Sequence, residues 1–90
     1  MTTSEPDPAA PDDHSPTAVL LVAHGSRNPA AAVEHEALCE RVRGRAAELA
    51  GTPVDVRAAY LEIAEPSVPA AIDDAVAAGA GKVVVVPHFL

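Results

Sequence analysis

Two uninterrupted apolar runs constrain the fold of this chain more than any other feature. Residues 18–23 (AVLLVA) are continuously apolar, and residues 82–86 (KVVVV) are four valines after Lys82; both are short, contain β-branched side chains and show no polar alternation. Such runs are typical of strands that are buried on both faces, as in a parallel sheet. Residues 53–61 instead alternate between apolar and polar side chains, which predicts a strand with one wetter face, nearer an edge of the sheet.

Two helices are predicted between these strands. Asn28 and Pro29 give the first helix an N-cap and a first-turn proline, and Gly51 ends it. Ser67 caps the second helix, and Gly79 stops it. The apolar positions that recur at helical spacing, and should face the sheet, are Ala31, Leu38, Val42, Ala46 and Leu49 in the first helix and Val68, Ile72, Ala75 and Val76 in the second.

The predicted order of elements is strand, helix, strand, helix, strand, so two right-handed crossovers feed one parallel sheet. With the wetter strand outside and the first strand central, the strand order is 2-1-3. The sequence therefore predicts an α/β fold with a flavodoxin-like parallel sheet, incomplete, of which three strands and two helices are present. Sheets of this kind bind ligands above the carboxyl ends of the strands, where the winding reverses.

The first 17 residues differ from the rest in composition. They contain four prolines, no Lys or Arg, and the acids Glu5, Asp7, Asp12 and Asp13. Such a segment buries too little apolar surface to offset its ordering entropy, so residues 1–17 are predicted to be a disordered acidic leader. Residues 18–90 form the predicted α/β domain.

Charge and cysteine content exclude several classes of protein. The net charge is −7 and neither part of the chain is basic, which argues against a nucleic-acid partner. No apolar run approaches the ~18 residues of a membrane span. Cys39 is the sole cysteine, so no internal disulfide can form, and a reducing cytoplasmic location is expected.

His24 directly follows the first apolar run and precedes Gly25, Ser26 and Arg27. A neutral imidazole at a strand end suits a metal ligand or general base, although a hydrogen-bonded histidine without a chemical role is the alternative. A hydroxyl and a guanidinium at a strand-to-helix turn are typical of an anion site. Ser26 and Arg27 are therefore candidates for substrate binding, with Arg27 either pairing with a carboxylate or capping loop carbonyls.

Other candidate residues lie on the same predicted rim. His88 follows the last strand, and adjacent strands are about 5 Å apart, so His88 and His24 could share one crevice and a metal ion. Glu62 and Glu65 follow the second strand, where they could attract a cation or receive protons, or simply be solvated. His35 lies early in the first predicted helix, between glutamates, and is expected to be exposed. An open metal site is favoured because no Cys pair or H-x-x-x-H motif is present.

The segments LLVAHGSRNP, AYLEIAEPS and KVVVVPHFL, in this order and spacing, resemble the small sirohydrochlorin chelatases over about residues 18–90. These class II enzymes of the cobalamin and siroheme pathways insert cobalt, iron or nickel into an acidic tetrapyrrole. The resemblance implies a chelatase-like doubly wound sheet, a divalent metal ion as substrate and no organic cofactor. It also implies that His24 binds the metal and helps take protons from the pyrrole nitrogens. The family's cleft lies between two similar halves, provided by a homodimer or a tandem duplication.

The resemblance ends where family members continue into a Gly-x-His loop with a second metal ligand and a further strand and helix. The chain is therefore expected to be an N-terminal fragment whose last strand is an exposed apolar edge. His88 matches a variable family position, so its proposed role rests on the strand ends alone. One alternative is a metal- or tetrapyrrole-binding fragment without catalytic activity. Another is phosphoryl transfer with His24 as nucleophile, which is disfavoured because only Arg27 is nearby in sequence.

Overall fold

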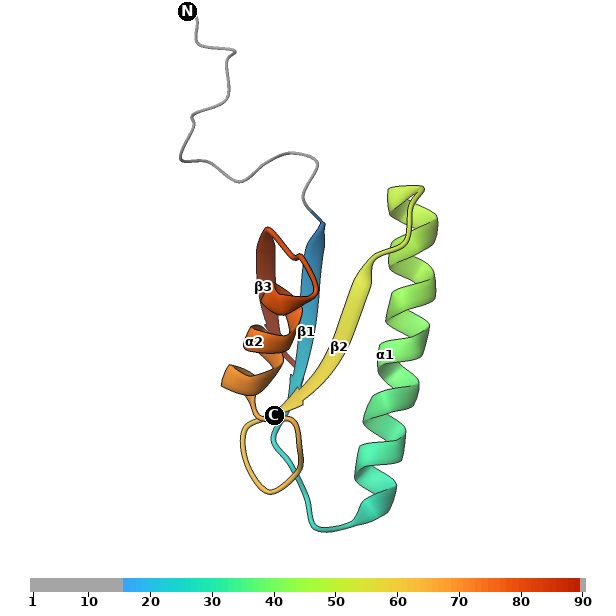
Figure 1. The fold of residues 1–90 in the computed structure, drawn as a ribbon. Helices are drawn as coiled ribbons and strands as arrows, with labels where there is room; N and C mark the ends of the chain where they lie inside the picture. Colours follow the sequence, from blue (N-terminus) through green and yellow to red (C-terminus); the bar gives the residue numbers. More distant parts are fainter. Residues whose placement is uncertain (1–15, 90) are drawn as a thin grey trace, which may run out of the picture.

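The computed structural model describes residues 16–89, so most of the predicted leader lies outside the described residues. The elements alternate as predicted: β1 (Thr17–Ala23), α1 (Pro29–Ala50), β2 (Asp55–Tyr60), α2 (Val68–Ala77) and β3 (Lys82–Pro87). The described chain forms a sheet covered by α1 on one face and α2 on the other (Figure 1).

The sheet confirms the predicted order, β2-β1-β3, with every strand parallel. Val19 of the central strand pairs with Val56 of β2 and with Val84 of β3. The predicted helix caps are present too: the Asn28 side chain accepts a hydrogen bond from Ala30, and the Ser67 hydroxyl accepts one from Ala70.

Each helix covers one apolar face of the sheet. Beneath α1, Leu21, Val56, Ala58 and Tyr60 pack with Cys39. The cluster beneath α2 contains smaller side chains: Ala59 and Ala71 pack there with Leu20 and Val22. Because these alanines are small, the helix can approach the sheet closely. The described core is thus divided by the central strand, whose successive side chains point to opposite helices.

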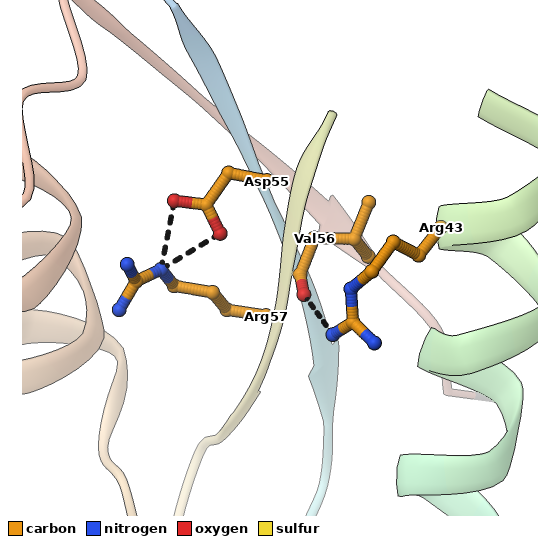
Figure 2. Close-up of polar contacts among 4 residues, drawn as sticks. All are labelled: Arg43, Asp55, Val56 and Arg57. Carbon is orange, nitrogen blue, oxygen red and sulfur yellow. Dashed lines mark hydrogen bonds and ion pairs between the residues drawn. The ribbon is translucent and has the colours of Figure 1, made fainter. Parts of the chain in front are cut away.

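The predicted wetter face of β2 carries an ion pair. The Arg57 guanidinium donates to the Asp55 carboxylate at 3.0 Å, with both side chains partly buried. On the other side of the strand, Arg43 reaches from α1 to donate to the Val56 carbonyl (Figure 2). This second contact anchors the middle of α1 to β2.

The prediction that Leu49 and Val76 face the sheet is wrong. Leu49 is 74% exposed and Val76 is 57% exposed. The 22 residues of α1 span about 33 Å, longer than the strands, so its last turn extends beyond β2 (Figure 1). In α2, Ala71 and Ala75 form the row that touches the sheet, and Val76 lies about 100° further around the helix.

The prediction that β3 is buried on both faces is also wrong. Val84, Val85 and Val86 are partly exposed. The reason is coverage: α1 packs over β1 and β2, and the α2 cluster reaches β3 through Val83. In the described sheet β3 is therefore an exposed apolar edge strand. None of the helices within residues 16–89 is both long and apolar enough to cross a membrane.

The buried central strand should dominate stability. Replacing Leu20, which is fully buried, with Ala is expected to lower the free energy of unfolding by roughly 2–5 kcal/mol, because a cavity remains between β1 and α2. The same change at the exposed Leu49 should cost at most about 0.5 kcal/mol. Urea denaturation followed by circular dichroism measures both, and equal effects would contradict the described core.

The buried thiol predicts a pH dependence. Burial raises the pKa of Cys39 above its ordinary 9.0, and the charge of Glu36 adds to this effect. Above about pH 9 the unfolded chain loses this proton first, so the free energy of unfolding should fall as pH rises. The variant Cys39→Ala should show a flatter profile between about pH 8 and 10 in the same urea assay; an identical slope would be contrary to this expectation.

Candidate metal site at the carboxyl edge of the sheet

The loops that follow β1 and β2 leave the sheet on the same side, at the carboxyl ends of the strands (Figure 1). Hydrogen bonding between them continues beyond the strands: the Leu61 amide donates to the Ala23 carbonyl at 3.0 Å, and the Glu62 amide donates to the His24 carbonyl at 3.1 Å. The backbone therefore places residues 24 and 62 side by side before any side-chain contact is considered.

The side chains of His24 and Glu62 meet above this ladder. His24 Nε2 lies 3.4 Å from Glu62 Oε2, and the two side chains are 63% and 59% exposed. An imidazole nitrogen and a carboxylate oxygen are both ligands for divalent transition metals. The pair can thus bind a cation from solution or exchange protons with a bound molecule.

Gly25 allows the two loops to approach this closely. Its φ is +107°, and a Cβ atom built there would lie 1.8 Å from the Glu62 carbonyl oxygen. No side chain fits at that distance, and an L-residue rarely adopts that φ. The glycine of the His-Gly-Ser sequence is therefore required by the contact between the loops.

The next two candidates, Ser26 and Arg27, lie in the turn that leads into α1. The Ser26 hydroxyl accepts a hydrogen bond from the Asn28 amide at 3.1 Å, which gives it a role within the turn. Arg27 is exposed and forms no ion pair with another residue of the described chain. Its predicted contact with a substrate carboxylate stays a prediction.

His88 continues the ladder on the other side of β1, since its amide donates to the Val22 carbonyl at 2.7 Å. His24 and His88 line one hollow of about 260 Å³, together with Phe89. Their ring neighbours differ: His24 faces Phe89 edge-on at 6.4 Å, and His88 stacks on His35 at 6.2 Å. Among residues 16–89, no group of three or more His, Cys, Asp or Glu side chains could together hold a metal ion.

The prediction that His35 is exposed is wrong. This side chain is 6% exposed, and its Nε2 atom lies 2.8 Å from the Leu21 carbonyl oxygen. The flanking glutamates suggested exposure, but the helical spacing indicates burial of His35. The inner face of the helix has the i, i+3, i+4, i+7 pattern of His35, Leu38, Cys39 and Val42. His35 and His88 also line a larger hollow of about 640 Å³ beside α1.

Residues 18–90 match the family model described as CbiX. Over 73 residues the chain is 40% identical to a sirohydrochlorin cobaltochelatase of Methanopyrus kandleri, an alignment that covers 81% of this chain and 48% of that protein. The chain therefore spans about half the length of this curated relative. No solved structure matches it significantly.

Substitution by alanine should have opposite effects on the free energy of unfolding at Gly25 and at Gly44. Gly25→Ala should destabilise the chain by roughly 1–3 kcal/mol, since the new methyl group meets the Glu62 carbonyl in a strained backbone. Gly44→Ala should raise the free energy of unfolding by up to about 1 kcal/mol, because alanine favours the helix and a Cβ atom built at Gly44 meets no neighbouring atom within 4 Å. Urea denaturation measures both; a neutral Gly25→Ala would mean that the loops are further apart than described.

Proposed function

Because this chain belongs to the CbiX family of sirohydrochlorin chelatases, we propose that it acts in the insertion of a divalent metal, cobalt or iron, into a sirohydrochlorin-type tetrapyrrole. The name of the Methanopyrus relative, a cobaltochelatase, favours cobalt. The metal ion is a substrate in this reaction. Since the chain spans about half of that relative, turnover requires a second half of the cleft, from another copy or from further polypeptide.

The observation that carries this proposal is the 3.4 Å separation of His24 Nε2 and Glu62 Oε2. Two donor atoms that each lie ~2.0–2.1 Å from one ion, at a tetrahedral angle, are about 3.3–3.4 Å apart. The pair therefore has the spacing of two ligands of a single ion without rearrangement. We assign His24 and Glu62 as the residues that hold the metal before its transfer.

An ion held by two side chains keeps other coordination positions open. These positions are available to the ring nitrogens, which favours delivery of the metal over its storage. As the ion enters the macrocycle, two pyrrole N–H protons must leave. His24 and Glu62 lose the ion at that moment, and each can then accept one proton, so the charge of the site is balanced.

Substrate contacts are proposed for the turn before α1. The macrocycle is acidic, and the exposed Arg27 guanidinium can form paired hydrogen bonds with one of its carboxylates. Ser26 can donate through its hydroxyl hydrogen, because its oxygen already accepts from Asn28. His88 lines the same hollow as His24 and stays a predicted additional ligand.

One alternative has specific support. The hollow next to His24 has a volume of only about 260 Å³, and the chain covers 48% of its relative. Both observations fit a chain that binds the metal or part of a tetrapyrrole without turnover. Phosphoryl transfer lacks such support, because the described residues that line the hollow with His24 include no arginine, and Arg43, Arg45 and Arg57 each pair with an acid of their own element.

The metal assignment predicts the following Co²⁺ affinities, measured by anaerobic calorimetric titration. His24→Ala should weaken binding by at least about tenfold, and Glu62→Gln by about tenfold, since each removes one ligand. Glu65→Gln, three residues further in the same loop, is the matched control and should stay within about twofold. The proposal is wrong if His24→Ala binds Co²⁺ as the parent chain does.

A second anaerobic Co²⁺ titration, in the presence of sirohydrochlorin and followed by its visible absorbance, distinguishes an enzyme from a binding fragment. Appearance of the metallated spectrum, dependent on His24, supports insertion by this chain. Bound Co²⁺ without that spectrum supports the alternative. Comparing His88→Ala with His24→Ala then tests whether the second imidazole contributes to metal affinity.

A further inference from the structure

We infer that His35 is a positioning residue of the proposed metal site. Its hydrogen bond and ring contacts in the described chain are to Leu21, Tyr60 and His88, not to His24 or Glu62, so it acts through the end of β1 and the ring of His88. The inference rests on the proposed function, because it concerns the same site. It is drawn from this chain's own contacts, which join α1 to the carboxyl ends of the central strand, β2 and β3.

The first contact fixes the ring of His35. Its Nε2 atom lies 2.8 Å from the Leu21 carbonyl oxygen, in a buried environment. A carbonyl oxygen only accepts hydrogen bonds, so the imidazole must carry its proton on Nε2 and donate it. Leu21 lies three residues before His24, so this bond ties α1 to the strand end from which the proposed ligand extends.

Two further rings hold the imidazole of His35 in place. Tyr60, the last residue of β2, meets it edge-on at 5.3 Å with an interplanar angle of 61°. His88 stacks on it at 6.2 Å with an angle of 21°. Such aromatic contacts are directional and stabilise one relative orientation of the rings. His35 is therefore enclosed by groups from the ends of all three described strands.

The contacts continue from His88 to the proposed site. The backbone of His88 is fixed by its hydrogen bond to Val22, and the residue lines both hollows. The next residue, Phe89, places its ring 6.4 Å from that of His24. Loss of His35 would remove the surface on which His88 stacks and would loosen the wall next to His24. A site on rigid, supported elements binds its ligand more tightly than one whose support is mobile.

The test measures Co²⁺ affinity of the full chain at a temperature where circular dichroism shows each variant to be folded. His35→Leu replaces the imidazole donor with an apolar side chain that still fills the buried position, and should weaken Co²⁺ binding by about tenfold. His35→Gln keeps an N–H at the distance of Nε2, and should restore affinity to within about threefold of the parent. Val33→Gln, at a 69% exposed position of the same helix, is the control and should bind as the parent does.

The outcomes separate this inference from the proposed function. If His24→Ala abolishes Co²⁺ binding while folded His35→Leu binds like the parent, His35 is only structural and the inference is wrong. If His24→Ala has no effect, the metal assignment itself fails. A lowered unfolding midpoint with unchanged affinity also identifies a purely structural role.

A double-mutant cycle decides the matter if His35→Leu does not fold. His35→Asn, whose shorter side chain no longer reaches the Leu21 carbonyl, His88→Ala and the double variant are compared in the same Co²⁺ titration. Because His35 is proposed to act through His88, the effects of the two changes should depart from additivity by at least about threefold. Additive effects would overturn the inference.

Discussion

The structure depends on the hydrogen bonds that β1 makes to both neighbours beyond the ends of the strands. The carbonyls of Val22, Ala23 and His24 accept, in turn, from His88, Leu61 and Glu62. Three segments that are distant in sequence are thereby fixed by main-chain atoms alone. The side chains at these positions are therefore not needed to hold the segments together. His24 and Glu62 can project into solvent with little loss of folding stability. Gly25 is the exception, because the loops can approach only where it has no side chain.

Stability and chemistry are separated along the strand direction. The ion pairs of α1, Arg43 with Glu40 and Arg45 with Glu48, involve side chains that are exposed except for the partly buried Arg43, and such surface pairs contribute little to stability. Most of the stability must come from the apolar residues below the edge, where Leu20 and Val56 are almost fully buried. The polar groups at the edge are then carried by a core that they do not help to form.

The sequence predicted those features that arise from local signals and one rule of handedness. Apolar runs identified the strands, and Asn28 and Ser67 marked the helix starts. The crossover rule predicted right-handed connections in one parallel sheet, and the wetter pattern of residues 53–61 placed that strand outside, which gave the order 2-1-3. The rim carrying His24 and Glu62 followed from that order, but their contact did not, because it depends on backbone bonds beyond the strands. His35 was missed for a different reason: neighbouring charges suggested solvent, whereas tertiary packing and one carbonyl acceptor bury the ring. The exposure of Leu49 and Val76 depends on helix length and rotation relative to the sheet, which periodicity does not specify.

The two outer strands of the described sheet differ in what they offer to another polypeptide. β2 holds the Asp55–Arg57 ion pair, and a chain docking along it would have to strip water from both charges (Figure 2). β3 presents valines, which lose nothing by being covered. The exposed valines of β3 therefore make it the more favourable of the two outer strands for pairing with a further strand. A strand paired with β3 would place the ends of β1 and β3, which His24 and His88 follow, in the interior of a wider sheet.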